Sequence, residues 1–318
     1  GGWPKYKANK ANTNTALSDA TANSGTEKWH FSADGNIYGI VISETGNIYF
    51  GTVNGTFYIF DRNGVNVKKI PLCSRIDTSP VIGNDHHIYV FCNSSLIALD
   101  EQANKQWETS LSLKTGNYLS SPSIDSEGNI HSAGVKISYT GKVLWNLNLE
   151  SYEAVSPAIG FQDLVYYINR AYDTEGKPKW HYSTTGSAEW ETVLDEKDNT
   201  YFLTFIAGAS KLHKMNIYGQ HTWQTDPEKT EDEWFASGFS LSPDKSFYLP
   251  RISNNTYMII DQNGLVLSAP DPDKTLIGDF PPIFDNEGNT FTYTRTLLKA
   301  YTSDHTFEWE YKGSNIST

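Results

Sequence analysis

The chain has 318 residues, of which 38% are hydrophobic and 19% are charged, so it can bury a large core and is neither a disordered polyelectrolyte nor a coiled coil. With 25 Lys and Arg against 37 Asp and Glu, the net charge is −12, which argues against generic binding to nucleic acid or to an anionic membrane. No run of about 18 apolar residues occurs, so no membrane-spanning helix is expected.

The first element in chain order is a polar arm. Residues 5–26 are rich in Asn, Thr and Ala and have no hydrophobic core of their own. We therefore expect residues 1–26 to form an extended N-terminal arm and residues 27–318 to form a single domain.

The rest of the chain repeats one pattern seven times. Each repeat has a short apolar strand, a polar turn, an aromatic strand, a third strand, an acidic or glycine turn, and a strand that often ends in Trp. The mean spacing of about 40 residues suits one four-stranded blade of a β-propeller. No amphipathic helical window is found, so we predict an all-β fold. The repeats begin near Ile40, Ser79, Ser121, Ser156, Trp190, Ser237 and Pro281.

Six of the nine tryptophans occupy the same place in the fourth strand, and in four cases a Gly stands four residues earlier. A large ring repeated once per unit is expected to pack between neighbouring blades. Because the first of these tryptophans precedes the first complete repeat, an eighth blade is an alternative to the favoured seven. The six residues are Trp29, Trp107, Trp145, Trp180, Trp223 and Trp309.

The sequence resembles a known superfamily. The units GKVLW and GKPKW, the S-P-x-I blade openings and the initial WPKYKANKANT resemble the PQQ-like repeat propellers. This superfamily includes quinoprotein alcohol dehydrogenases and the lipoprotein of the outer-membrane β-barrel assembly machinery. The resemblance implies a propeller over essentially the whole chain, but one scaffold of this kind hosts many activities.

In such a propeller, one edge of each blade carries the loop into its first strand and the turn after its second strand; we call this the loop edge. The loop edges are expected to open on one face around the central channel, where a ligand is sought first. The chain has only five Arg against 20 Lys, and four of the five fall at loop edges. Arg makes planar, bidentate contacts with carboxylate, sulfate or phosphate, and aromatic faces suit sugar rings. The predicted ligand-binding residues are Arg75, Arg170, Arg251, Arg295, Trp190, Trp234, Tyr118, Tyr152, Glu189 and Asp279.

The alternative is structural: each Arg pairs with an acidic neighbour and ties blades together. Catalysis is a further alternative, in which loop-edge carboxylates hydrolyse a glycoside or a Tyr acts as the base in eliminating a uronate. Carboxylates available for this are Glu153, Glu189, Glu191 and Asp279.

The two cysteines fall on the same loop edge, so a disulfide between Cys73 and Cys92 is expected, with two buried thiols as the alternative. They are not the adjacent Cys pair that the quinoprotein dehydrogenases place over their quinone, so no cofactor is expected. The eight His are scattered, which predicts no metal site. No nucleophile elbow or phosphate-binding loop appears.

These observations favour an exported, extracytoplasmic, non-enzymatic propeller that binds an acidic glycan or an envelope or extracellular protein, and a monomer is expected. A polysaccharide lyase or glycoside hydrolase acting at the same loop edges is the alternative, and a quinoprotein oxidoreductase ranks last.

Overall fold

The computed structural model describes residues 3–16, 18, 20, 22–114, 120–150, 155–184, 187–206, 209–225, 238–251, 255–267 and 276–313. The chain divides into two compact units, which are described separately. Unit 1 comprises Gly1–Lys10, Lys28–Lys179 and Ser317–Thr318, and unit 2 comprises Ala11–Glu27 and Trp180–Ile316.

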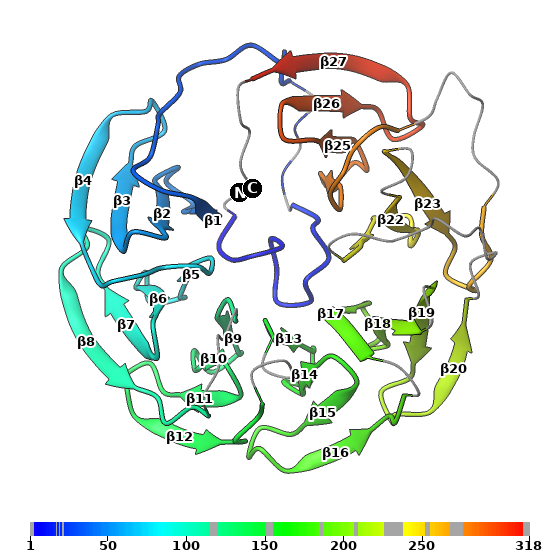
Figure 1. Cartoon of the computed structure of the whole chain (residues 1–318), viewed down its shortest axis with the longest axis horizontal. Helices are drawn as coiled ribbons and strands as arrows, with labels where there is room; N and C mark the ends of the chain where they lie inside the picture. Colours follow the sequence, from blue (N-terminus) through cyan, green and yellow to red (C-terminus); the bar gives the residue numbers. More distant parts are fainter. Residues whose placement is uncertain are drawn as a thin grey trace. The chain divides into compact units, whose positions relative to one another are not determined.

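Unit 1 holds blades 1 to 4, which are four-stranded antiparallel sheets (Figure 1). Blade 1 consists of β1 (Ile37–Ile42), β2 (Ile48–Thr52), β3 (Thr56–Phe60) and β4 (Asn66–Pro71). Blade 2 consists of β5 (Val81–Ile82), β6 (Ile88–Cys92), β7 (Ser95–Leu99) and β8 (Lys105–Ser110). Blade 3 consists of β9 (Ser123–Ile124), β10 (Ile130–Ser132), β11 (Val135–Ile137) and β12 (Val143–Asn146). Blade 4 consists of β13 (Ala158–Ile159), β14 (Val165–Tyr167), β15 (Arg170–Tyr172) and β16 (Pro178–His181), which continues into unit 2.

Unit 2 holds blades 5 to 7. Blade 5 consists of β17 (Ser187–Leu194), β18 (Thr200–Ile206), β19 (Ala209–Met215) and β20 (His221–Gln224). Blade 6 has three described strands, β21 (Ser240–Leu241), β22 (Phe247–Arg251) and β23 (Thr256–Ile260), and Val266 forms a bridge to Ile260 at the fourth-strand position. Blade 7 consists of β24 (Ile283–Phe284), β25 (Thr290–Tyr293), β26 (Leu297–Tyr301) and β27 (Phe307–Lys312).

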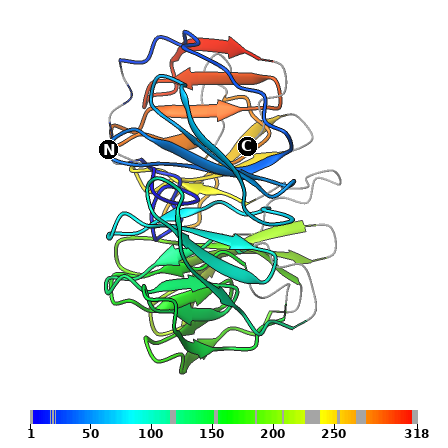
Figure 2. The ribbon, with the colours of Figure 1, turned by 90° about the vertical axis from the view of Figure 1, so that its left-hand side faces the viewer.

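The chain is therefore an all-β, seven-bladed β-propeller, as predicted, and the described residues include no helix. None of them forms a helix long and apolar enough to cross a membrane. The strands of each blade follow one another in sequence order as antiparallel hairpins, which Figure 2 shows from the side. Each blade thus has a loop edge and, opposite to it, a turn edge that carries the turns between its first and second and its third and fourth strands.

The second strands of blades 1 to 4 are almost entirely buried, which is typical of strands that pack against neighbours on both faces. The second position of this strand is a buried Tyr in five blades, whereas blade 3 has His131 and blade 7 has Phe291 there. The tyrosines are Tyr49, Tyr89, Tyr166, Tyr201 and Tyr248.

The tryptophans pack between neighbouring blades, as the repeat predicts. The ring of Trp107 in β8 lies against Gly141 of blade 3, where an added Cβ would come within 2.8 Å of it. Trp145 meets Gly176 in the same way, and in unit 2 Trp223 meets Gly264. Each of these three glycines, which lie in the turns before fourth strands, therefore receives the tryptophan of the preceding blade.

Trp29 differs from the prediction because it lies outside the described strands. It stacks on Phe60 with ring centroids 5.8 Å apart and covers Gly64 in blade 1. Its segment therefore packs through rings rather than through a hydrogen-bonded ladder, and no eighth blade is needed to explain it.

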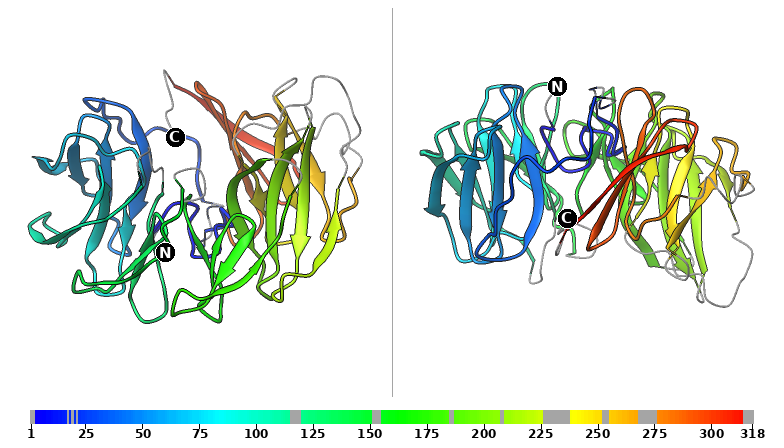
Figure 3. Two further views of the ribbon diagram at one scale, coloured as in Figure 1. Left: turned by 60° about the horizontal axis from the view of Figure 1, so that its bottom comes forward. Right: turned by 90° about the horizontal axis from the view of Figure 1, so that it is seen from above.

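The N-terminal arm, dark blue in Figures 1 and 3, runs along the first strands of the blades. In unit 1, the carbonyls of Trp3, Pro4 and Lys10 accept the backbone N–H groups of first-strand residues in blades 1, 2 and 4. In unit 2, the carbonyls of Ala11, Thr13 and Asn14 do the same for blades 5, 6 and 7. The residues whose N–H groups are capped are Ile42, Ile82, Ile159, Leu194, Leu241 and Phe284.

Candidate functional site

The four predicted arginines each lie at the loop edge of a different blade. In unit 1, Arg75 precedes blade 2 and Arg170 opens β15 of blade 4. In unit 2, Arg251 ends β22 of blade 6 and Arg295 occupies the turn between β25 and β26 of blade 7. Arg170 and Arg251 are half-buried, whereas Arg75 and Arg295 are exposed.

Arg75 makes the local ion pair that the structural alternative predicts. Its Nε lies 2.8 Å from Oδ2 of Asp77, and its side chain is 53% exposed. This pair stays within the loop before β5 and joins no two blades.

Five of the other predicted residues cannot be placed by side chain. Tyr118, Tyr152 and Trp234 lie outside the described residues. Glu189 and Trp190 belong to β17, for which the strand and its register with β18 are described but these two side chains are not. Their roles stay predictions.

In unit 2, the loop edge of blade 7 carries a stacked aromatic pair. Phe280 in the loop before β24 and Tyr293 at the end of β25 stack with ring centroids 5.3 Å apart and an interplanar angle of 13°. Both rings are half-buried. Asp279 precedes Phe280 and is tied to β25 by a hydrogen bond from its backbone N–H to the Tyr293 carbonyl.

Hydrogen bonds from blade 6 and from β25 fix the loop that carries Phe280. The buried hydroxyl of Tyr257 in β23 donates to the Phe280 carbonyl at 2.7 Å, and the hydroxyl of Thr292 donates to the Ile277 carbonyl. Burial holds the pKa of Tyr257 well above its usual value, so this hydroxyl keeps its proton. Pro250, paired with Tyr257, places the adjacent Arg251 at the same loop edge. We call the stacked pair of Phe280 and Tyr293 the aromatic platform. Arg251 and Arg295 lie at the loop edges of the same two blades, 6 and 7.

In unit 1, a disulfide joins Cys73 and Cys92 at the loop edge of blade 2, with a Cα–Cα distance of 6.3 Å. Cys92 ends β6 and is buried, and Cys73 belongs to the preceding loop. The bond therefore ties that loop to the central strand of its own blade.

A buried charged cluster in blade 3 is the feature that the sequence analysis did not find. The Asp125 carboxylate lies 3.0 Å from Nε2 of His131 and 2.9 Å from Nζ of Lys136, and all three side chains are at most 4% exposed. Asp125 also accepts backbone N–H groups from its own turn. The signal was a charged residue, Lys136, at a third-strand position where blades 2 and 4 have Ala98 and Ala171.

Burial and hydrogen bonding act in opposite directions on this cluster. Burial alone would raise the pKa of Asp125, but the hydrogen bonds from His131 and Lys136 outweigh it and hold that pKa well below its usual value. Burial lowers the pKa of His131 against the opposing effect of Asp125. A neutral His131 thus lies beside an Asp125–Lys136 ion pair, and within the described ranges its Nδ1 has no hydrogen-bond partner.

The described residues include no group of three or more His, Cys, Asp and Glu that could hold a metal ion. In blade 5, Nδ1 of His213 lies 3.4 Å from Nε2 of His221, which makes a pair and not a group of three. His213 also contacts the Thr204 hydroxyl at 2.8 Å, and its ring stacks on Phe202 in the blade 5 sheet.

No protein-family model and no curated protein matches the chain. Solved structures do match. BamB from Moraxella catarrhalis is 15% identical, with 87% of this chain and 86% of that chain covered and a TM-score of 0.59. A streptogramin B lyase is 13% identical over 81% of this chain and 90% of that chain, with a TM-score of 0.57. The dihydro-heme d1 dehydrogenase NirN is 12% identical over 90% of this chain and 68% of that chain, with a TM-score of 0.54.

At these identities the likeness concerns the fold. The chain is a propeller of the kind found in BamB, which confirms the fold that the sequence resemblance implied. Because the matching structures include a lyase and a dehydrogenase, the fold alone selects no activity.

Proposed function

We propose that this chain is an exported, non-enzymatic propeller that binds an acidic glycan at the loop edges of blades 6 and 7. The observation that carries the proposal is the stacked pair of Phe280 and Tyr293, with Arg251 and Arg295 at the same edges. The rings offer apolar faces to a sugar, and the guanidinium groups offer paired donors to its carboxylate or sulfate.

The surroundings support a site that is formed before the ligand arrives. The hydrogen bond from Tyr257 to the Phe280 carbonyl fixes the loop without using either ring of the platform. A binding surface that needs little ordering keeps more of its interaction energy as affinity.

The disulfide supports the extracytoplasmic part of the proposal. Disulfides such as Cys73–Cys92 persist in oxidising compartments and are rare where thiols are kept reduced. BamB, a propeller with the same fold, is the neighbour that agrees with a binding role.

The test is calorimetric titration of the protein with polygalacturonate, with dextran as the neutral polymer. We expect the wild type to bind polygalacturonate and not dextran. Phe280→Ala should weaken binding at least tenfold, and Arg251→Ala combined with Arg295→Ala should abolish it. Arg62→Ala is the matched control because Arg62 lies in the turn between β3 and β4, at the turn edge of blade 1.

Two results would overturn the proposal. One is that neither polygalacturonate nor a sulfated glycan such as heparin binds to the wild type. The other is that the exposed Arg295→Ala change, made alone, leaves the affinity unchanged while Arg62→Ala lowers it. Turnover of the polymer, seen as rising near-ultraviolet absorbance or as new reducing ends, would instead assign the same platform to an enzyme.

A further inference from the structure

Two lysines occupy the same third-strand position in different blades. Lys136 in β11 lies opposite His131 of the second strand, and Lys214 in β19 lies opposite Tyr201. Blades 2, 4 and 7 have Ala at this position, so a lysine is not needed there to build a blade. The group that compensates each charge therefore has to be sought around each lysine separately.

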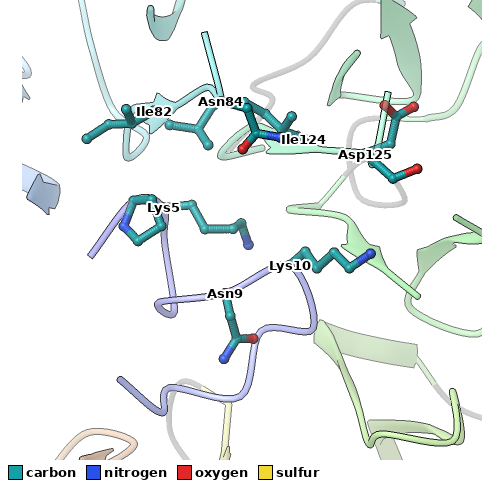
Figure 4. Close-up of a pocket in the computed structure, with 10 residues that line it drawn as sticks. Lys5, Asn9, Lys10, Ile82, Asn84, Ile124 and Asp125 are labelled. Carbon is teal, nitrogen blue, oxygen red and sulfur yellow. The ribbon is translucent and has the colours of Figure 1, made fainter. Parts of the chain in front are cut away.

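In blade 3, the lysine is compensated by the acid in the turn between the first and second strands. This acid is Asp125, which Figure 4 shows beside Ile124 in the wall of a pocket of unit 1. Its carboxylate lies 2.9 Å from Nζ of Lys136, and both side chains are at most 4% exposed. Lys136 is thus neutralised by a residue of its own blade.

In blade 5, the equivalent acid is Asp195, and hydrogen bonds already occupy both of its oxygens. Oδ1 accepts the backbone N–H groups of Lys197 and Asn199. Oδ2 accepts the Asn199 amide at 2.8 Å and the Tyr201 hydroxyl at 3.0 Å. Within the part of the chain that the structure describes, Lys214 makes no ion pair, and its Nζ lies 5.5 Å from the centre of the Tyr201 ring.

Lys214 lines a pocket between the turn edges of blades 5 and 6, both of which belong to unit 2. The pocket has a volume of about 80 Å³, and its apolar lining consists of the buried residues Tyr201, Leu241 and Phe247. Because one water molecule needs roughly 10–15 Å³ of such space, a small polyatomic ion can enter. The other lining residues are Asp195, Glu196, Lys197, Asn199, Lys245 and Gln262.

The charges of this lining favour an anion that carries two negative charges. Lys245 is paired with Glu196, which removes one lysine and one acid from the balance. Lys197 is exposed, and among the described residues no carboxylate lies within ion-pair distance of it or of Lys214. Two uncompensated positive charges therefore line the pocket, next to one acid whose oxygens are already hydrogen-bonded.

We propose that this pocket binds a phosphate dianion, either free or as a phosphomonoester. Lys214 supplies one positive charge from the lining between the blades, Lys197 supplies the second from the exposed side, and the side-chain amide of Gln262 is an uncharged donor for a further oxygen. The site lies at a turn edge rather than at the loop edges and involves no reaction, so it is independent of the proposed function.

The test is backbone amide NMR of the whole chain at pH 8, where phosphate is a dianion, with sodium chloride holding the ionic strength constant. We expect sodium phosphate to shift the amides of Lys197, Lys214 and Gln262 with one common affinity. Sodium acetate should bind about tenfold more weakly or less, because it offers one charge where two ammonium groups are uncompensated. Glycerol 2-phosphate distinguishes the two sources: equal affinity assigns the site to a phosphomonoester, and weaker affinity assigns it to free phosphate.

Three variants complete the test. Lys214→Met removes the ammonium group while keeping the length of the side chain, and should weaken phosphate binding about tenfold or more. Lys197→Met, at an exposed position outside the core, should weaken it about threefold. Lys142→Met is the matched control, because Lys142 is also exposed but lies in the turn between β11 and β12 of unit 1. It should leave the affinity unchanged.

The amide spectrum of each variant shows whether it is folded, and Lys197→Met carries the test if Lys214→Met does not fold. Three results would overturn the proposal. The first is that phosphate shifts none of these amides up to tens of millimolar, and the second is that acetate binds as tightly as phosphate. The third is that the folded lysine variants of the pocket bind phosphate as tightly as Lys142→Met does.

Discussion

The ammonium group of Lys68 donates to the carbonyl of Gln102 at 2.6 Å, at a place where other blades use tryptophan. Five indole N–H groups make the equivalent bond to the turn of the next blade, among them Trp107 to Tyr139 and Trp145 to Thr174, both at 3.0 Å. Where those rings lie on glycine, Lys68 faces a turn that has Ala103 instead, with a φ of 58°. Lys68 replaces tryptophan and Ala103 replaces glycine together, because a tryptophan ring at residue 68 would need a residue without a Cβ at position 103.

The first prediction follows from this pairing. Lys68→Trp alone should destabilise the chain by about 1–3 kcal/mol, because the indole would meet the Ala103 Cβ. Ala103→Gly should relieve both the clash and the left-handed backbone, so that the double variant is more stable than Lys68→Trp. Chemical unfolding of the wild type and the three variants gives the coupling energy. Additive effects within about 0.5 kcal/mol would contradict the explanation.

The second prediction concerns pH. His131 is buried with a lowered pKa, so the folded state keeps it neutral while the unfolded state takes up a proton below its ordinary value of 6.5. Stability should therefore be complete above pH 6.5 and fall as the pH drops below it. His131→Tyr introduces the residue that five other blades have at this position and should reduce this loss between pH 7 and pH 5.

Urea unfolding of the wild type and of His131→Tyr at pH 8, 7, 6 and 5 measures the difference. The contribution of Asp125, whose pKa is depressed, is present above the ordinary value of 3.8 and is lost only at lower pH, so it does not overlap this window. If the free energy of unfolding falls equally with decreasing pH in the two proteins, His131 is protonated in the folded state.

The third prediction concerns the disulfide. Cys73 and Cys92 are 19 residues apart, and a loop of this size closed by a disulfide typically contributes about 3 kcal/mol. Reduction should lower the midpoint of guanidinium unfolding of the wild type and leave Cys73→Ser with Cys92→Ala unaffected. An unchanged midpoint would mean that the two sulfurs are thiols in the protein.

The fourth prediction concerns the aromatic platform. Tyr257→Phe leaves the Phe280 carbonyl without its buried donor and should cost about 1–3 kcal/mol of stability. Polygalacturonate affinity should fall as well, because the loop then has to be ordered on binding. Tyr89→Phe is the comparison, since Tyr89 is also buried and its hydroxyl donates to Asp85 within blade 2 of unit 1. Equal affinity of all three proteins for polygalacturonate would show that the Tyr257 hydroxyl does not contribute to binding.

The fold was predictable because the residues that pack between neighbouring blades recur once per blade in the sequence. Trp107, Trp145 and Trp223 recur at a fixed place in fourth strands, and the glycines that receive them recur with them. Repetition of this kind identifies a unit even though the identity to a matching structure such as BamB is only 15%.

The arm and the blade 3 cluster were not predictable in this way. The arm binds through backbone carbonyls, which every residue has, so nothing in residues 3–16 distinguishes a capping segment from a free one. Asp125 is indistinguishable from the other turn acids until Lys136 is placed beside it. The positions of Arg251, Arg295 and Asp279 at loop edges follow from the repeat, and their role in binding stays a prediction. The stacking of Tyr293 on Phe280 depends on a loop path that the repeat does not specify.

The capping pattern also has a consequence for biogenesis. The arm is synthesised before all seven blades, yet Asn14 and Ala16 make their hydrogen bonds to Phe284, which is translated almost 270 residues later. These arm residues cannot form their hydrogen bonds to Phe284 until blade 7 has been synthesised. The arm's composition of Asn, Thr, Ala and Lys suits this delay, because a polar segment with little β-propensity stays soluble and resists aggregation until its partners have been synthesised.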